Sequence, residues 1–439
     1  MTTVPERQAS GAVAAPALAG IRAESPLKAT DLGPTRNRDF RRVLVGQGIS
    51  AVGDAVSTTT MPLLALALTG SGLQMGIVGV LQRLPDLLFG LPAGAYADRW
   101  DRRRMMLWAD AGRAGLTALI PLAAILGLPV MAVVFVVLFP INACRVLFMA
   151  GWTATIPNLV ARDQLGRAQG VFAAVSGLSY IIGPAVAGLL VTQIGAAMTL
   201  GIDAITFVIS AVSLMFIQRS LRSSEAPTPV SLVHEIGEGI RFVAQHQVLR
   251  DALAFSSVVS LVAAPVIPVV TFYITVDRGL PASAFGFVIS AYSIGTLLGA
   301  LLGSRRMTGR LASHLLIGNL LVGLTTAGLA LASSLPIMLV CAVASGASQA
   351  IVLVAAATLR AANSPDALLG RVGSTARTLS AVIQPIGLLA GGLLLDLIGG
   401  GSTLLIIAGV TVVASLAFSL SPGIRQAHAM PPAVAEAIA

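Results

Sequence analysis

The sequence predicts an all-α membrane protein with twelve transmembrane helices in two pseudo-symmetric six-helix bundles. The composition is the first reason: of 439 residues 11% are charged and 56% hydrophobic, with a mean hydropathy of +0.87, whereas a soluble domain has about 25% charged residues. The second is that apolar runs of about 20 residues, the length that crosses a bilayer, follow one another from residue 43 to residue 420. The third is the one-sided distribution of the arginines among the loops.

The apolar runs form two groups of six, separated by a polar stretch. The first group comprises residues 43–68, 73–97, 105–126, 130–154, 168–193 and 198–217. The second comprises residues 252–276, 283–303, 313–331, 336–359, 379–398 and 403–420. We therefore expect an N-terminal tail (1–42), a first bundle (43–217), a linker (218–250), a second bundle (251–421) and a C-terminal tail (422–439).

The loop arginines predict the orientation of these spans. If the N-terminus is cytoplasmic, the cytoplasmic loops hold Arg99, Arg102, Arg103, Arg104, Arg162, Arg167, Arg219, Arg222, Arg241, Arg250, Arg305, Arg306, Arg310, Arg360, Arg371 and Arg377. The opposite loops hold only Arg278. Because cytoplasmic loops accumulate Lys and Arg, we expect a multi-pass protein of the cell inner membrane with both termini in the cytoplasm.

The linker pattern predicts a surface helix, and the glycine pattern predicts that the two halves repeat. In the linker, Val233, Ile236, Ile240 and Val243 recur at helical intervals, which predicts an amphipathic helix along the cytoplasmic membrane surface. The glycine pair of the second span, 90 and 94, recurs as 295 and 299 in the eighth span. Repeated halves are typical of secondary transporters, which build a central site with two alternating entrances between them.

The loop between the second and third spans carries a recognisable signature. Residues 94–104 read GAYADRWDRRR, which resembles the loop motif of the major facilitator superfamily. The stretch from Gly46 to Asp54 and the segment IPNLV at residues 156–160 are similar to its drug:proton antiporter branch, which includes macrolide and enterobactin exporters. The loop departs from the superfamily pattern at Tyr96 and Asp101, where Leu and Gly are usual. The resemblance covers nearly the whole chain.

This resemblance implies a cytoplasmic latch. Its glycines would let the second span pack closely on a neighbour. The Asp98 carboxylate would accept hydrogen bonds from arginines or face a helix N-terminus. Asp110 and Arg113 are interpreted as packing and gating partners farther along the third span. The expected gating residues are Gly90, Gly94, Asp98, Arg99, Arg102, Arg103, Asp110 and Arg113. The alternative is that the arginines serve orientation alone.

Few ionisable residues lie inside the spans, so they are the candidates for proton coupling. Asp54 stands near the middle of the first span, and a carboxylate at that depth costs about 2.5 to 3.5 kcal/mol when it is charged. Our hypothesis is that Asp54 carries the proton, with a structural role as the alternative. Asp86 pairs with Arg83, one turn away, or shares the proton. Asp203, in the sixth span, is a relay or a helix-end residue.

Polar and aromatic side chains of both halves are the candidates for substrate contact. Tyr180 lies in a Gly- and Pro-containing stretch similar to the antiporter signature of the same family. Arg145 has no acidic neighbour in its own helix and is expected to face Asp54 or an anionic substrate. The full set is Gln47, Thr58, Met61, Asn142, Arg145, Tyr180, Ser260, Tyr292, Gln349 and Gln384. The alternative is that the hydroxyls and amides only hold helices together.

Several function classes are excluded or disfavoured. A P-loop ATPase needs a Gly-rich loop ending in Lys, and the only lysine is Lys28 in the tail. Neither the two cysteines nor the four histidines are spaced as metal ligands. We predict a monomeric exporter of a small organic molecule, driven by proton antiport, whose partners are the substrate, protons and the lipid bilayer. It needs no cofactor, metal or nucleic acid. The alternatives are an uptake transporter or facilitator of the same fold, or a non-transporting membrane sensor.

Overall fold

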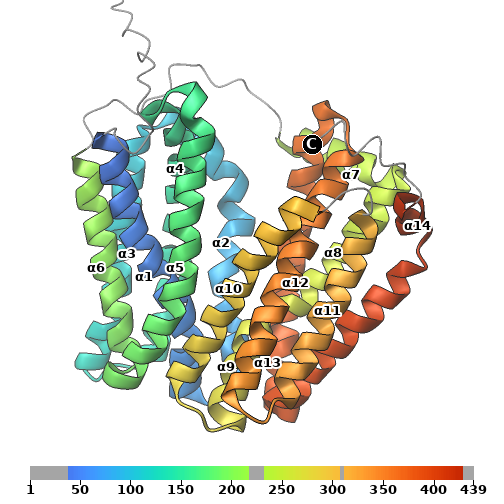
Figure 1. The fold of residues 1–439 in the computed structure, drawn as a ribbon. Coiled ribbons are helices and arrows are strands. Elements are labelled where there is room, and N and C mark those ends of the chain that lie inside the picture. Colours follow the sequence, from blue (N-terminus) through green and yellow to red (C-terminus); the bar gives the residue numbers. More distant parts are fainter. Residues whose placement is uncertain (1–37, 217–231, 307–310, 429–439) are drawn as a thin grey trace, which may run out of the picture.

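The computed structural model describes residues 38–216, 232–306 and 311–428, and the regular elements within these ranges are all helices (Figure 1). The first half contains α1 (Arg38–Thr69), α2 (Gly72–Arg99), α3 (Arg102–Ile125), α4 (Val130–Leu159), a 3-10 turn (Arg162–Gln164), α5 (Leu165–Ile194) and α6 (Ala196–Met215). The linker contains α7 (Leu232–Gln245). The second half contains α8 (Gln247–Ala263), α9 (Val266–Phe272), a π-helical turn (Tyr273–Asp277), α10 (Ala282–Arg306), α11 (Leu311–Leu331), α12 (Leu335–Ala362), α13 (Asp366–Ser419) and α14 (Pro422–His428).

The predicted all-α membrane fold is confirmed, while the number of spans stays a prediction. In the described part of the chain, nine helical segments are long and apolar enough to cross a bilayer. α2 and α3 are not among them; they have 28 and 24 residues and carry several charged side chains. α13 counts once although it is 54 residues long. Of the expected tails (1–42 and 422–439), residues 1–37 and 429–439 lie outside the described residues, as does the first part of the linker; the remaining residues of the tails belong to α1 and α14.

Two predicted spans differ from the helices in the structure. The seventh span is not one helix: α8 ends at Ala263, before Pro265, whose missing N–H interrupts the helical ladder. α13 begins at Asp366, so the predicted start at residue 379 is wrong. It also continues past the predicted loop at 399–402, broken only at Gly399, where φ is 76° and ψ is 174°. Glycine adopts that backbone conformation without strain, and the chain reverses there almost without a loop.

The two halves touch at one end of the molecule. We call the end that carries α7 the linker end, at the top of Figure 1, and the other the opposite end. At the opposite end α2 packs on α13, where a Cβ added at Gly76 would lie 2.5 Å from the Leu388 carbonyl oxygen. α5 packs on α10 equally closely, since a Cβ at Gly188 would lie 2.6 Å from the Ala282 carbonyl oxygen. Only glycine permits these approaches of one backbone to another.

A carboxylate also joins the halves at the opposite end. Asp396, on α13, accepts hydrogen bonds from the Ser71 hydroxyl at 2.9 Å and from the backbone N–H of Leu73 at 3.0 Å. The backbone N–H of Gly72 donates to the same carboxylate. These are the first, otherwise unpaired, donors of α2. The second half therefore caps a helix of the first.

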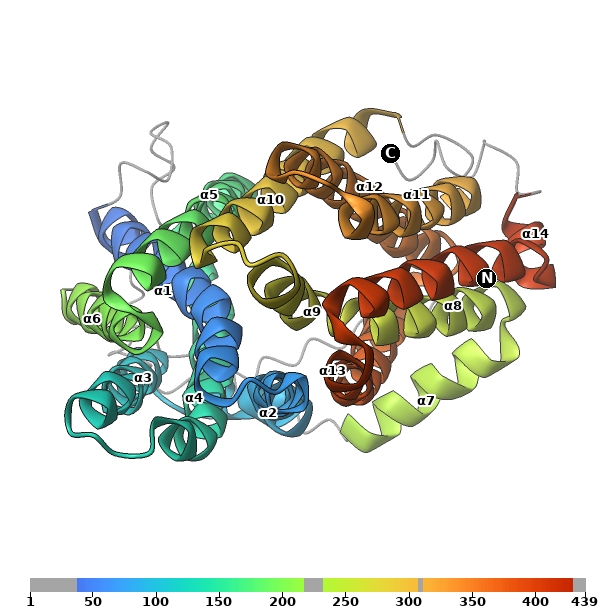
Figure 2. The ribbon, with the colours of Figure 1, turned by 90° about the horizontal axis from the view of Figure 1, so that it is seen from below.

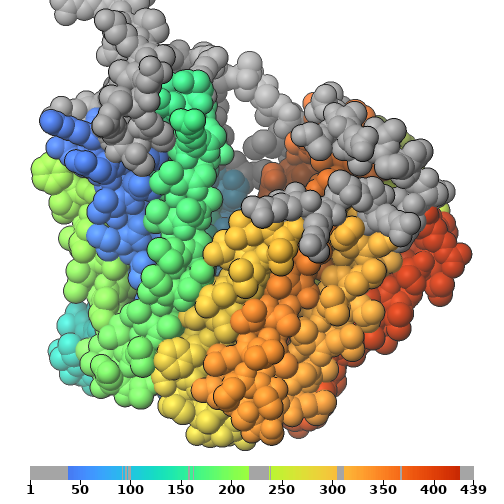
Figure 3. All heavy atoms as spheres, viewed as in Figure 1, coloured from blue at the N-terminus to red at the C-terminus, as the bar shows by residue number. Residues whose placement is uncertain are grey.

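The halves diverge at the linker end. There, a Cβ added at Gly90 on α2, or at Gly166, Gly170 or Gly177 on α5, would meet no atom within 4 Å. The space-filling view shows a notch between the two halves at this end (Figure 3). The close packing expected at Gly90 is therefore not made in this structure, because nothing packs within 4 Å of a Cβ added there. The molecule is closed at the opposite end and open at the linker end.

The linker helix packs on the second half. Val243 of α7 is buried with Leu249, Leu253 and Val372, and a Cβ at Gly239 would lie 2.8 Å from the Arg371 carbonyl oxygen. Viewed from the opposite end, α7 runs along the outer edge of the second half (Figure 2). Part of the predicted apolar face therefore packs against α8 and α13 rather than facing outward.

Candidate functional site

A buried arginine of α3 is the centre of the polar interior of the first half. The guanidinium of Arg113 donates to Asp110, one turn earlier on α3, and lies 3.5 Å from a carboxylate oxygen of Asp54 on α1. Its central carbon lies 4.2 Å and 4.7 Å from the ring centroids of Phe207 and Phe148. Two aromatic faces and two carboxylates thus hold one charged group in a fixed orientation.

Two carboxylates near Arg113 accept hydrogen bonds from hydroxyl groups on α6 and α1. The Ser210 hydroxyl donates to Asp110 at 2.6 Å. Asp203 accepts from the hydroxyls of Ser57 and Thr206. Asp203 approaches α1 closely because residue 53 is glycine: a Cβ there would lie 2.3 Å from its carboxylate oxygen. α1, α3 and α6 therefore each bring polar side chains to the same place.

We call Asp54, Asp110, Asp203 and Arg113 the carboxylate cluster. It places three acids around one cation, so full ionisation would leave an excess negative charge in a low-dielectric interior, which is unfavourable. Asp110 and Asp203 are buried, whereas the side chain of Asp54 is 41% exposed. Asp54 is therefore the most exposed acid of the cluster.

A second ion pair lies between α2 and α4. Arg145 donates to Asp86 at 2.6 Å, and its Nε donates to the Asn142 side-chain oxygen at 3.2 Å. The predicted pairing of Asp86 with Arg83 is wrong, because Asp86 faces α4 while Arg83 lies exposed in the cavity. Arg145 faces Asp86 rather than Asp54.

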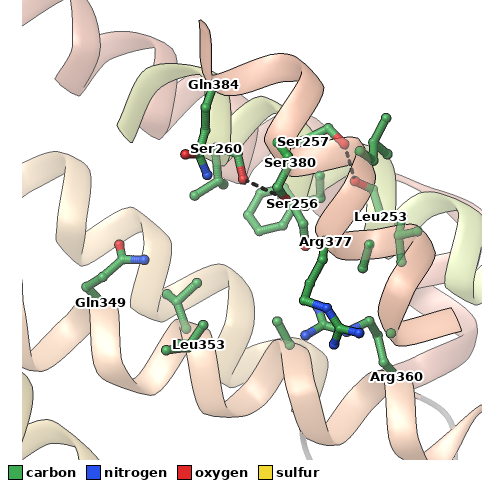
Figure 4. A pocket seen from close by; sticks show the side chains of 18 of the residues that line it. Leu253, Ser256, Ser257, Ser260, Gln349, Leu353, Arg360, Arg377, Ser380 and Gln384 are labelled. Atoms are coloured by element: carbon green, nitrogen blue, oxygen red, sulfur yellow. Dashed lines mark hydrogen bonds between the residues drawn. The ribbon is translucent and has the colours of Figure 1, made fainter. Parts of the chain in front are cut away.

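A central cavity separates the two halves. Its first part, the arginine chamber, has a volume of about 510 Å³ and is lined by Arg83 and the Asp86–Arg145 pair from the first half. The second half supplies most of the remaining wall, in which Ser260 and Ser380 hydroxyls lie 3.3 Å apart (Figure 4). The second part, the apolar chamber, has a volume of about 330 Å³. Gln349 lines both, so the two chambers adjoin.

A family model described as transmembrane secretion effector matches residues 29–435. The chain belongs to this family of the major facilitator superfamily. The resemblance predicted from the loop at 94–104 is thereby confirmed, and the protein is a multi-pass membrane protein of a transporter family.

Relatives and solved structures agree with this membership. The multidrug efflux pump Tap of Mycobacterium tuberculosis is 32% identical over 405 residues, covering 89% of this chain and 95% of the relative. Macrolide efflux protein A of Streptococcus pyogenes is 27% identical over 369 residues, covering 82% and 90%. The fold matches the nucleoside transporter NupG with a TM-score of 0.70 at 14% identity, over 87% of this chain and 98% of that one. A bacterial homologue of the iron transporter ferroportin matches with a TM-score of 0.69 at 16% identity, over 90% of this chain and 99% of that one.

The structure gathers most of the predicted substrate residues around the cavity. Those that line it are Thr58, Arg145, Tyr180, Ser260, Tyr292, Gln349 and Gln384. Asn142 instead supports Arg145. Gln47 is buried between α1 and α6, where it donates to Ser210 at 2.7 Å. Met61 packs in the apolar core of the first half. These two were misplaced because helical spacing alone does not tell a helix–helix contact from a cavity wall.

The predicted gating residues are only partly described. Arg102 donates to the Ala154 carbonyl at 2.7 Å, and Arg103 to the Leu214 carbonyl at 3.0 Å in the last turn of α6. Both arginines thus bind helix carbonyls, and the one at the end of α6 carries the negative end of the helix dipole. The side chains of Asp98 and Arg99 and the surroundings of Gly94 lie outside the described part of the chain.

Sequence reasoning missed two arginines of the cavity wall. Arg360 and Arg377 were assigned to a cytoplasmic loop, because the predicted spans ended at 359 and began at 379. The structure places them on α12 and α13, lining the arginine chamber. The usable signal was the helical spacing of Arg377, Ser380 and Gln384, which share one face of α13.

Proposed function

We propose that the protein exports a small organic molecule across the inner membrane by proton antiport with alternating access. The names of the relatives, a multidrug and a macrolide efflux pump, support export. The arginine-rich loops support a cytoplasmic linker end, so the described state is the one that loads substrate from the cytoplasm. The segments 43–217 and 251–421 are the two bundles that rock against each other around the cavity.

The carboxylate cluster is the observation that favours proton coupling. With Asp54 ionised, its attraction to Arg113 stabilises α1 against α3, and a proton on Asp54 weakens that attraction while lowering the excess negative charge of the cluster. The two protonation states thus favour different packings of α1, which also carries Thr58 into the cavity. Proton binding and substrate binding are then coupled through one helix.

A single substitution tests the coupling. In Asp54→Asn the amide cannot change charge, so we expect normal membrane insertion but loss of efflux driven by a pH gradient. Accumulation of organic substrates, a macrolide among them, in everted vesicles with an acid lumen measures this directly. Asp163→Asn, which removes an exposed carboxylate from the turn before α5, is the matched control. Full gradient-driven efflux in Asp54→Asn would refute the assignment of the proton to Asp54.

The same vesicles separate export from uptake or facilitation. An exporter accumulates substrate in everted vesicles when their lumen is acid, and the accumulation collapses when the gradient is dissipated. A facilitator only equilibrates the substrate, and an uptake carrier moves it in the other direction. The carboxylate cluster favours the coupled exporter, since a facilitator needs no exchangeable acid.

A further inference from the structure

Two arginines of the second half converge on the arginine chamber. Arg360, on α12, is partly buried, and Arg377, on α13, projects from the facing wall. Figure 4 shows their guanidinium groups side by side, and the two charges act on each other. Like charges held this close together are unfavourable unless an anion joins them.

Within the described part of the chain, no carboxylate joins these arginines. Among the described residues, Arg83, Arg360 and Arg377 have neither an ion pair nor a hydrogen bond, although all three line the chamber. Of the described residues that line the chamber, the one acid is Asp86, which is already paired with Arg145. These lining residues thus carry an excess of three positive charges.

The neighbouring apolar chamber has a mainly apolar lining, in contrast to the charged lining of the arginine chamber. It is lined mainly by apolar and aromatic side chains, among them Val262, Ile289 and Tyr292. Val259 and Gln349 border both chambers. A molecule that fills both would place an acidic group at the arginines and an apolar body against the aliphatic and aromatic wall.

We propose that the cavity binds amphipathic organic anions, with a carboxylate, sulfonate or phosphate group held by Arg360 and Arg377. This inference rests on the proposed function in that the cavity is taken as the substrate path. Guanidinium groups suit it because each presents paired donors to the oxygens of such a group. The apolar chamber adds affinity through burial of the body of the molecule.

A pair of probes that differ only in charge tests the proposal. Dansylate is a naphthalenesulfonate anion, and dansylamide is its uncharged sulfonamide. Binding of each to the purified full-length protein is measured by fluorescence in phosphatidylcholine nanodiscs, without a proton gradient. We expect dansylate to bind about 10- to 100-fold more tightly, as for hydrogen bonds to a charged group. Equal binding, or no binding, of the two probes to the wild-type protein overturns the proposal.

Three variants test which residues cause the preference for dansylate over dansylamide. The double variant Arg360→Gln/Arg377→Gln should lose it while keeping its affinity for dansylamide, which also reports that the cavity is folded. Arg241→Gln removes the same charge from the exposed face of α7 and should keep the preference. Tyr292→Ala should weaken the binding of dansylate and of dansylamide by the same factor. A double variant that still prefers dansylate would show that other groups bind the anion.

A second lipid composition distinguishes the source of the anion. If the arginines hold a lipid phosphate instead, phosphatidylglycerol nanodiscs should abolish the preference for dansylate, and the proposal fails. If they hold the substrate, the preference persists there. Because binding needs no gradient, its result is independent of the Asp54→Asn experiment: failed coupling with intact anion preference would reject only the proton antiport.

Discussion

Arg113 shows how one side chain can organise a site built from four helices. Its charge is shared between carboxylates of α3 and α1, and its faces are covered by rings of α4 and α6. Removing one partner of a buried ion pair is more destabilising than never having made the pair, because the remaining charge is left without compensation. The cluster should therefore be sensitive to loss of its single cation.

We expect Arg113→Gln to lower the free energy of unfolding by about 3 to 5 kcal/mol. The measurement is thermal or denaturant unfolding of the purified protein in detergent. Arg104→Gln, at an exposed position on the same helix, should change it by about 0.5 kcal/mol or less. If the two variants unfold alike, Arg113 does not hold the first half together.

The sequence could identify the members of this cluster but not their pairing. Asp54, Asp110, Arg113 and Asp203 stand out because ionisable residues inside membrane spans are rare. Which of them meet depends on the rotation and register of α1, α3 and α6, which are set by long-range packing. For the same reason the local spacing of Arg83 and Asp86 predicted a pair within α2, whereas Asp86 faces Arg145 on α4.

At the scale of elements, helix ends decide how the halves are held together. The opposite end depends on Asp396, which caps α2 from the other half. The sequence showed this residue only as an acid at the end of a span. Its role needs the three-dimensional contact, because Ser71 and Asp396 are 325 positions apart. By contrast, most span positions were predictable, since hydropathy is a local property.

Loss of the Asp396 cap should open the opposite end. Capping of a helix N-terminus by a carboxylate contributes on the order of 1 to 2 kcal/mol, so Asp396→Ala should raise the open population about 5- to 30-fold. The readout is maleimide labelling, from outside intact cells, of a cysteine at Leu388, which packs between α2 and α13, after Cys144 and Cys341 are replaced by serine.

Asp277→Ala is the control for this experiment. Asp277 accepts from the Gly401 N–H at 2.7 Å at the same end of the molecule, but within the second half. Its loss should leave the labelling rate unchanged. Equal rates in the Asp396 and Asp277 variants would mean that the contact between the halves does not depend on the cap.

At the scale of the whole molecule, the described state is asymmetric between its two ends. Small residues of α2, α5, α10 and α13 hold the opposite end closed, while the corresponding glycines at the linker end face open space. The sequence predicted the repeat that makes two entrances possible. It did not predict which entrance is open, because both states use the same sequence and differ only in which contacts are made.

The unpaired arginines of the cavity also have an electrical consequence. A carrier that exports a monovalent anion and admits one proton moves two charges per cycle in the direction favoured by an inside-negative potential. Each charge contributes about 2.3 kcal/mol per 100 mV, so the potential alone supplies about 4.6 kcal/mol, or roughly a 10³-fold gradient. In proteoliposomes with a potassium diffusion potential and no pH gradient, voltage should therefore drive export of dansylate more strongly than that of dansylamide, which moves one charge. An equal response would mean that no substrate charge is translocated. If dansylate responds more strongly, the membrane voltage, and not the pH gradient alone, sets how far the pump can lower the concentration of its substrate in the cell.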